Sequence, residues 1–305
     1  MAAAGVLSAR NHGALREELA FLPARTAGDF AARIARAADR GVVVGEFAGE
    51  QLVAFLGAFT IDDFRGLGAG AYGPDWCHGY AEALDGPSAM RRLYRELARR
   101  LVEKEIRIHA FGFYATEQEI LEAMYATGFG QIVIDAAVAT SDLARSLQEA
   151  STAIFVRRAA PDDAPLLERL NEELARHIAD LPVFFPDPRG MIQADWRTWL
   201  LEESHVALIA SEGGDAIGYI KAQEPQLDVT FAVHDETTLA INGMYVDPSK
   251  RRGRVGARLL LDLANTAAAG GKRMISVDFE STNIEAEGFW LRWFHPVTRS
   301  VERRL

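Results

Sequence analysis

The residue types most suited to chemistry are concentrated in one stretch of the chain, residues 241–260. There an apolar run stops at Asp247-Pro248, and a cluster of cations and glycines precedes an amphipathic pattern of helical period. The cluster comprises Lys250, Arg251, Arg252, Gly253, Arg254 and Gly256. Free N–H groups at a helix N-terminus attract phosphate, glycines let the backbone approach its oxygens, and guanidinium groups add charge-assisted hydrogen bonds. The pattern therefore indicates an anion site on a strand–turn–helix unit, although a basic, solvent-exposed loop would carry the same cations.

This stretch resembles the cofactor loop of the GNAT superfamily, the acyl-CoA-dependent N-acetyltransferases. The family pattern is a strand, then Val-Asp-Pro, then Arg/Gln-x-x-Gly-x-Gly/Ala at the start of a helix. Arg251 and Gly256 match the first and last positions of that loop. Arg254 stands where the family usually has its first glycine, and Gly253 lies one position earlier, so the loop departs from the family pattern there.

A second family pattern, Asn-x-x-Ala-x-x-Phe-Tyr after a strand, is similar to the segment that begins at Asn283. Asn283, Ala286 and Phe289 match it in order. Trp290 replaces the tyrosine that often acts as general acid toward the leaving thiolate, and an indole N–H donates a hydrogen bond but does not release a proton. The two patterns follow each other in the family's order, separated by a helix, and the resemblance covers residues 151–305.

The resemblance implies acetyl-CoA as the cosubstrate. It implies that the strand end from Met244 to Val246 offers backbone groups to the thioester carbonyl and the pantetheine, and that the loop holds the pyrophosphate. The strand of residues 274–279 would separate from that strand where acyl-CoA enters, so that unpaired backbone groups become ligands. The cofactor-binding residues implied in this way are Met244, Tyr245, Val246, Arg251, Arg252, Gly253, Arg254, Val255, Gly256, Ala257, Asn283 and Phe289.

The implied reaction is direct attack of an amine on the thioester. It needs a base to free the amine lone pair, donors for the tetrahedral oxyanion and an acid for the thiolate. Glu280, at the end of the second splayed strand, is the candidate base, directly or through water, and a surface carboxylate is the alternative. Tyr245 is the candidate acid, and packing between strand and helix is the alternative. A thiolate can also leave unassisted because its pKa is low.

The implied acceptor is a primary amine of a small molecule or peptide. Phe184, Phe185, Trp196 and Trp199 lie where the family places its acceptor-side helices. The spacing of the two tryptophans is more typical of an ordinary helix core. The turn formed by Phe184, Phe185 and Pro186 is less easily explained by core packing, so it stays a candidate part of the acceptor site.

An internal repeat sets the expected fold. Two β-hairpins, with turns at Gly49 and Gly213, lie about 164 positions apart, and Phe129 and Phe294 keep nearly the same offset. Each copy has the pattern of helices, a hairpin, a third strand, a long helix, a strand, a helix and a strand. In the second copy the last four elements before the final strand are expected at residues 239–246, 255–269, 274–279 and 284–292.

We therefore expect an α/β (α+β) protein of two tandem GNAT-like domains, each a mixed, mostly antiparallel sheet flanked by helices with a splayed central strand pair. The expected domains are residues 1–150 and 151–305, and the polar residues 139–151 are the expected connector. Where phosphates would bind, the first copy has Glu82 and Asp85 and no Gly-x-Gly, and carboxylates repel a pyrophosphate. We expect this degenerate copy to bind no CoA and instead to complete the acceptor cleft or bury the interface.

Composition excludes several other classes of protein. The chain has 305 residues, with 33 Lys and Arg against 43 Asp and Glu and a formal net charge of −10, so no overall attraction to nucleic acid or an anionic membrane is expected. Its one cysteine, Cys77, rules out an internal disulfide and favours the cytoplasm. Neither an export signal nor a membrane-spanning stretch is evident, and the 7 histidines lack metal-binding spacings, so no metal site is expected.

The sequence thus predicts an N-acetyltransferase, an acyltransferase, acting as a monomer or homodimer. Trp290 and Arg254 motivate one alternative, a non-catalytic acyl-CoA-binding protein. A third interpretation is an interaction protein whose two degenerate copies only pair with other chains. Both the enzyme and the binding protein would bind CoA, but only the enzyme would release free CoA when amines are offered.

Overall fold

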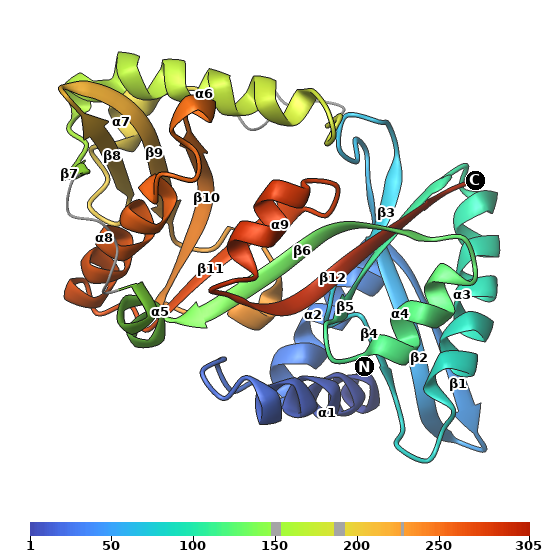
Figure 1. Ribbon diagram of the computed structural model, residues 1–305. Helices are drawn as coiled ribbons and strands as arrows, with labels where there is room; N and C mark the ends of the chain where they lie inside the picture. Colours follow the sequence, from blue (N-terminus) through green and yellow to red (C-terminus); the bar gives the residue numbers. More distant parts are fainter. Residues whose placement is uncertain (148–153, 186–192, 227–228) are drawn as a thin grey trace. The chain divides into compact units, whose positions relative to one another are not determined.

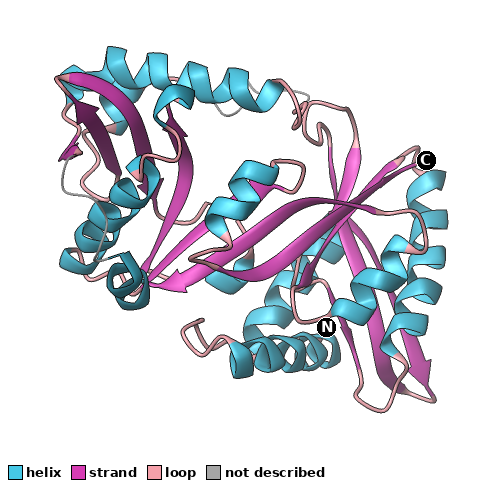
Figure 2. Ribbon diagram, in the orientation of Figure 1, coloured by secondary structure: helices cyan, strands magenta, loops and turns pink. Residues whose placement is uncertain are grey.

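The computed structural model describes residues 1–147, 154–185, 193–226 and 229–305. Both helices and strands occur in each half of the chain (Figure 2). The chain forms two compact units, each of which combines strands with helices (Figure 1). Unit 1 comprises Met1–Asp135, Thr230–Ala232 and Pro296–Leu305, and unit 2 comprises Ala136–Val229 and Val233–His295.

Unit 1 is a sheet covered by helices. Its helices are α1 (Ala2–Glu18), α2 (Ala27–Arg40), α3 (Gly86–Glu103) and α4 (Gln118–Tyr125). Its strands are β1 (Gly41–Ala48), β2 (Gln51–Ile61), β3 (Gly70–Gly73), β4 (His78–Tyr80), β5 (Ile108–Tyr114), the first part of β6 (Gly130–Ala139) and β12 (His295–Arg304). The strand order is β1-β2-β3-β5-β12-β6, with β4 beside β2. Leu93, Leu97 and Leu101 recur on one face of α3 and are buried in the same core as Leu56 and Phe111 of the sheet.

Unit 2 has the same kind of architecture. Its helices are α5 (Thr140–Leu147), α6 (Ala164–Ala179), α7 (Trp196–Trp199), α8 (Val255–Ala269) and α9 (Ile284–Trp290), with short 3-10 turns η1 (Pro161–Asp163) and η4 (Pro248–Lys250). Its strands are the end of β6, β7 (Phe155–Arg158), β8 (Val206–Glu212), β9 (Asp215–Gln223), β10 (Thr238–Val246) and β11 (Met274–Glu280). The strand order is β6-β11-β10-β9-β8-β7.

The helices of unit 2 cover both faces of its sheet. From β7 to β10, each strand pairs antiparallel with the next one along the chain, whereas β10 and β11 pair in parallel. On one face, Leu167 and Leu170 of α6 and Trp196 of α7 share a core with Tyr219 and Tyr245 of the sheet. On the other face, α8 packs on β8, β9 and β10 (Figure 1). The expected fold, a mixed and mostly antiparallel sheet flanked by helices, is confirmed.

The predicted order of elements also occurs in both halves, and the helix expected at residues 255–269 is α8 with the same bounds. Residues 139–151 were expected to be a polar connector. Residues 140–147 of this segment instead form α5, which packs on α8. The reason is a pair of leucines, Leu143 and Leu147, which lie one helical turn apart and are both buried. Residues 148–151 of this connector lie outside the described residues.

The C-terminal strand belongs to unit 1. Strand β12 pairs antiparallel with β5, with Thr298 opposite Tyr114 and Arg304 opposite Ile108, and Val301 of β12 is part of the unit 1 core. The compact units therefore divide the chain differently from the expected domains 1–150 and 151–305, because this last strand adds to the sheet of the first half. The division into two sequence copies itself stays a prediction.

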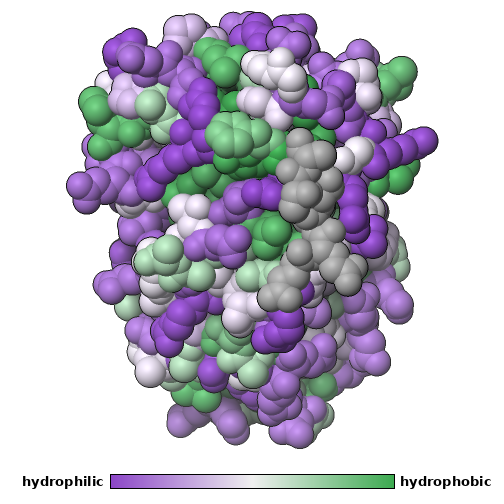
Figure 3. Space-filling view, turned by 60° about the vertical axis from the view of Figure 1, so that its left-hand side comes forward, coloured by the Kyte–Doolittle hydropathy of each residue, from purple (hydrophilic) through white to green (hydrophobic). Residues whose placement is uncertain are grey.

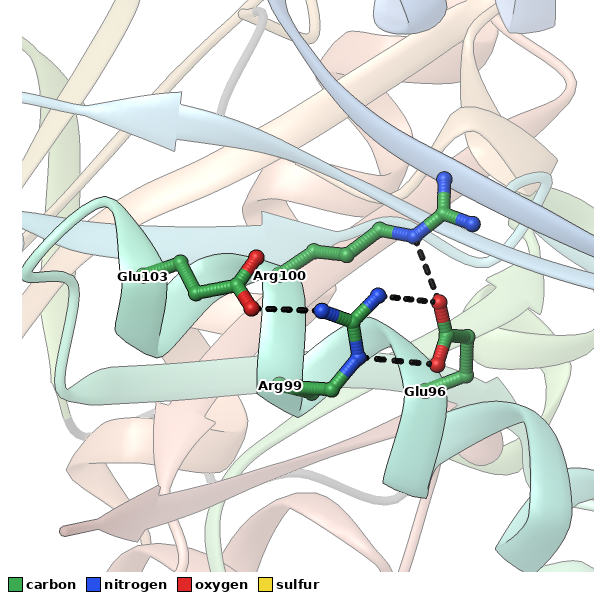
Figure 4. Close-up of polar contacts among 4 residues, drawn as sticks. All are labelled: Glu96, Arg99, Arg100 and Glu103. Atoms are coloured by element: carbon green, nitrogen blue, oxygen red, sulfur yellow. Dashed lines mark hydrogen bonds and ion pairs between the residues drawn. The ribbon is translucent and has the colours of Figure 1, made fainter.

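One face of the molecule shows how its surface residues are distributed. On the face drawn in Figure 3, hydrophilic side chains predominate and hydrophobic ones form separate groups among them. The outer face of α3 carries a network in which Glu96 accepts hydrogen bonds from Arg99 and Arg100, and Arg99 also pairs with Glu103 (Figure 4). These hydrogen bonds lower the pKa of Glu96 to about 2.

Among the helices described, none combines the length and the apolar character needed to cross a membrane.

Candidate active site

The sheet of unit 2 opens between its two parallel strands. Strands β10 and β11 pair from Thr238 to Ile241, opposite Met274 to Val277, and no further pair joins them in the described residues. A bulge at Asn242 follows, after which β10 continues to Val246 against β9 alone. The edge of β10 that faces β11 therefore has backbone groups that the sheet does not use. The splayed strand pair expected from the sequence is present.

The loop after β10 begins with a tight turn. Asp247 accepts hydrogen bonds from the backbone N–H of Ser249 at 2.8 Å and from its hydroxyl at 2.6 Å, which fixes the turn η4. Arg252 and Arg254 then take left-handed conformations with φ of 67° and 65°. Arg254, which replaces the family's first glycine, thus adopts a conformation that glycine takes without strain. The loop accommodates the replacement by straining an arginine.

The four cations of the loop do not all point to one place. Lys250 pairs with Glu212 at 2.5 Å. Arg251 donates from Nε to the carbonyl oxygen of Val246 at 3.2 Å and pairs through Nη1 with Glu285 at 2.5 Å, so it links the end of β10 to α9. Arg252 and Arg254 are exposed to solvent. Arg251 therefore has a structural role that its position in the sequence pattern did not reveal.

The start of α8 brings together three of the predicted residues. A Cβ atom placed on Gly256 would lie 2.9 Å from Cε of Met244 and 3.0 Å from Cζ of Phe289. Because Gly256 has no Cβ atom, these two side chains can close over the first turn of the helix. The first i→i−4 bond of α8 runs from the N–H of Arg258 to the carbonyl of Arg254, so the amides of Val255, Gly256 and Ala257 have no acceptor within the helix. These amides and the helix dipole favour an anion.

The candidate catalytic residues lie on either side of the strand opening. Tyr245 is 8% exposed and packs in the core beneath α6 and α7, and its pKa is raised, first by burial and then by Glu173 and Asp247. Because neighbouring residues of a strand point to opposite faces, Met244 faces α8 while Tyr245 faces α6. Glu280 is the last residue of β11 and is half-buried.

The residues of the second sequence pattern have clear local roles. Asn283 caps α9 by accepting a hydrogen bond from the N–H of Ala286 at 3.0 Å. Trp290 is 7% exposed and makes edge contacts with Phe289 and Phe294, with ring centroids 4.9 and 5.5 Å apart. The tryptophan that replaces the family's tyrosine is therefore a core side chain of α9.

The acceptor-side aromatic residues separate into two sets. Trp196 and Trp199 are buried and in edge contact, with centroids 5.5 Å apart, as the helical spacing indicated. Phe184 is 61% exposed and has a φ of 50°. Pro186 lies outside the described residues. The structure adds one residue that the sequence analysis missed, Lys221, a buried lysine of β9; its only signal is a cation inside an apolar strand.

The corresponding position of unit 1 is built differently. Asp85 caps α3 by accepting hydrogen bonds from the N–H of Ser88 at 3.1 Å and from its hydroxyl at 2.6 Å. The parallel pairing of β3 with β5 ends at Gly73, and Asp75 beyond it accepts backbone hydrogen bonds from Phe231 and Ala232. A carboxylate of the chain itself thus lies at the helix start, where unit 2 has free amides and cations.

Part of the chain matches a known family model, and several solved structures have a similar fold. Residues 171–295 match the model of the acetyltransferase (GNAT) family. No curated protein matches the chain. A functionally unknown conserved protein from Staphylococcus epidermidis has a similar fold, with 11% identity, a TM-score of 0.50, and coverage of 85% of this chain and 94% of the other.

Two GCN5-related N-acetyltransferases are also similar. The one from Kribbella flavida has 15% identity and a TM-score of 0.45, covering 89% of this chain and 94% of its own. The one from Sphaerobacter thermophilus has 18% identity and a TM-score of 0.49, covering 86% and 80%. The segment that matches the acetyltransferase (GNAT) family model, residues 171–295, contains the strand opening and the loop before α8.

Proposed function

We propose that the protein is an N-acetyltransferase that moves the acetyl group of acetyl-CoA to a primary amine of a small molecule or peptide. The observation that carries this proposal is the opening between β10 and β11 beside the free amides of α8, with Met244, Gly256 and Phe289 in contact at its edge. The match of this segment to the GNAT family supports it. The buried single thiol, Cys77, supports a cytoplasmic location.

The chain offers groups that suit each part of acetyl-CoA. The amides of Val255, Gly256 and Ala257, with the exposed guanidinium groups of Arg252 and Arg254, would hold the pyrophosphate. The unpaired edge of β10 would take the pantetheine amides as a further strand would. Phe289 and Asn283 would lie along the pantetheine. Bound in this way, acetyl-CoA supplies an activated acyl group.

The chemistry of the chain's own residues then follows. A backbone N–H of β10 past the bulge would donate to the oxygen of the thioester carbonyl as negative charge develops there. Glu280 would accept the proton of the attacking amine, directly or through water. The new C–N bond forms, the C–S bond breaks, and CoA leaves as a thiolate. Tyr245 stays the candidate proton donor, since Trp290 does not release a proton.

The test is calorimetric titration of acetyl-CoA into the full-length protein and into Arg252→Ala. Arg91→Ala is the matched control, because Arg91 is an exposed arginine of α3 outside the site. Binding that weakens severalfold in Arg252→Ala only, and weakens with salt, is expected because phosphate contacts are screened. Equal affinity in all three proteins would contradict this placement of the cofactor.

The second candidate is an acyl-CoA-binding protein without turnover. The burial of Trp290 favours it, because the position of the usual acid is part of the core. Acetyl-CoA is therefore offered with a panel of amines, and release of free thiol is measured. Release above the amine-free rate supports the enzyme, and tight binding without release supports the binding protein. An absence of acetyl-CoA binding would instead favour an interaction protein.

A further inference from the structure

A buried lysine lies beside the strand opening. Lys221 is 5% exposed, and its Cα pairs with that of Gly243, the first residue of β10 after the bulge. A Cβ atom on Gly243 would lie 2.9 Å from Cε and 3.1 Å from Cγ of Lys221. The lysine stem therefore crosses the strand at the glycine, at the point where β10 leaves β11.

The ammonium group lies among aromatic rings. Its Nζ is 5.4 Å from the ring centroid of Trp196 and 6.0 Å from that of Trp199, and it donates a long hydrogen bond of 3.5 Å to the amide oxygen of Gln193. Burial lowers the pKa of Lys221 to about 8, and no described charged group adds to that shift. Cation–π contacts and one weak hydrogen bond leave most of the desolvation cost of a buried cation uncompensated.

Two other lysines of unit 2 each have an acidic partner. Lys250 pairs with Glu212, and Lys272 pairs with Glu224 at 3.3 Å. For Lys221, no ion pair is found in the part of the chain that the structure describes. A buried charge without a counter-ion is costly, and none of the described carboxylates pairs with Lys221, so an anionic ligand at this place would stabilise the ammonium group.

A second donor at the same place lacks a partner. Trp196 is 3% exposed, and its Nε1–H has no acceptor among the described residues, whereas the Nε1–H of Trp199 donates to Gln223 at 2.8 Å. The hydroxyl of Tyr219 lies close by, 3.4 Å from a Cβ on Gly243. An anion at Lys221 would supply the acceptor that both the ammonium and the indole N–H need.

The face of the sheet on which Lys221 lies indicates which of the two substrates would approach it. Lys221 contacts α7 and so lies on the face of α6 and α7, whereas Met244 contacts Gly256 on the face of α8. A cofactor held at the start of α8 would reach the opening from one face. The other face, with Lys221, is then the side from which an acceptor approaches the thioester.

We propose that the acceptor amine carries a carboxylate, as a free amino acid does, and that Lys221 with Trp196 holds this carboxylate at the opening. This inference rests on the proposed acetyl transfer and narrows its substrate class. A neutral or purely cationic amine would bring no counter-ion to an ammonium group that has none among the described residues. The carboxylate would orient the neighbouring amine toward the thioester.

The turnover test compares amino acids with their primary amides as acceptors of the full-length protein. Wild type should use acids with a kcat/KM at least tenfold above that for the amides. Lys221→Met should lose this preference through a higher KM for the acids, with the affinity for acetyl-CoA unchanged. Lys221→Arg keeps a cation and should keep part of the preference, and Lys272→Met should keep all of it. Equal use of acids and amides by wild type would overturn the proposal.

A binding test needs no turnover. The ¹⁵N resonance of the Lys221 Nζ, identified by its absence in Lys221→Met, is followed while the same acids and amides are added to the acetyl-CoA-loaded protein. Acids should shift it and amides should not. If no acid shifts it, the carboxylate proposal fails, even if other amines release CoA. If acids shift it and no CoA is released, the carboxylate site stands and the proposed acetyl transfer fails.

Discussion

Asp75 accepts a backbone hydrogen bond from Phe231, 156 positions further along the chain, at 3.2 Å. Its second oxygen accepts from the N–H of Ala232 at 3.2 Å, and the carboxylate is only 2% exposed. The ring of Phe231 lies beneath two guanidinium groups, with Cζ of Arg25 4.3 Å and Cζ of Arg33 3.6 Å from its centroid. One buried carboxylate thus holds residues 230–232 in unit 1, beyond the parallel pairing of β3 and β5.

Asp75→Asn should destabilise the protein by about 1–3 kcal/mol, because an amide oxygen serves one of the two N–H groups and the NH₂ group faces the other. Urea unfolding at neutral pH measures the loss. Asp39→Asn, an exposed change on α2, is the control and should have little effect. An unchanged unfolding free energy in Asp75→Asn would show that these hydrogen bonds add nothing to stability.

The same pair predicts a pH dependence. Burial raises the pKa of Asp75, against the opposing effect of the Phe231 hydrogen bond. The folded protein therefore keeps this proton to a higher pH than the unfolded chain does. The resulting stability is complete below the ordinary carboxyl pKa and is lost as pH rises through the raised one. Since Asn does not titrate, the advantage of wild type over Asp75→Asn should shrink from pH 4 to pH 7. An advantage that grows over this range would contradict the assignment.

Local patterns in the sequence predicted much of the fold. The hairpin turn at Gly213 and the period of residues 255–269 depend on neighbours along the chain, so β8, β9 and α8 were predictable. The pairing of Val301 with Phe111 depends on residues far apart in sequence, and no local pattern encodes it. The same is true of Asp75 and residues 230–232.

The sequence patterns pointed to some of the residues that lie together beside the strand opening, but not to others. The structure brings Met244, Gly256 and Phe289 together, while their expected cofactor-binding roles stay predictions. The ion pair of Arg251 with Glu285 was not predictable, because it joins a loop to a later helix. Lys221 was missed because alternation in a strand shows which residues share a face but does not show that a lysine is desolvated there.

Arg254→Gly should stabilise the protein by about 0.5–1 kcal/mol. The left-handed conformation of Arg254 costs an L-residue about 1–2 kcal/mol, and glycine would relieve this strain. Part of the stability gained is lost again, because glycine has greater conformational freedom in the unfolded chain. Arg258→Gly, four residues later in α8, is the contrasting variant and should destabilise by about 1 kcal/mol because it lies within the helix. Relative to wild type, the urea midpoint should rise in Arg254→Gly and fall in Arg258→Gly. Destabilisation by both would show that the strain at Arg254 is compensated by its own contacts.

Gly256→Val should abolish acetyl-CoA binding while leaving the protein folded. The added side chain would displace Phe289 and Met244 from the start of α8, and Gly256→Ala should weaken binding only severalfold because the Met244 side chain can move. Gly288→Ala is the matched control, since nothing lies within 4 Å of a Cβ at this glycine of α9. Calorimetry gives the affinities and circular dichroism the folding. Wild-type affinity in Gly256→Val would contradict this position of the cofactor.

Lys221→Met should stabilise the protein at neutral pH, by about 3 kcal/mol at most. Burial lowers the pKa of Lys221 to about 8, so between that pH and the ordinary lysine value near 10.5 the folded protein binds fewer protons than the unfolded chain. The cost of the buried charge is therefore full below pH 8 and disappears as pH rises toward 10.5.

Urea unfolding of wild type and Lys221→Met at pH 7, 8.5 and 10 should show an advantage of the variant that shrinks with pH. Lys272→Met, which removes a partly exposed lysine paired with Glu224, should change stability by less than about 1 kcal/mol. A variant that is less stable than wild type at every pH would mean that the lysine stem and its aromatic contacts outweigh the desolvated charge. In that case Lys221 would be explained by packing, and its cost would no longer argue for an anionic acceptor.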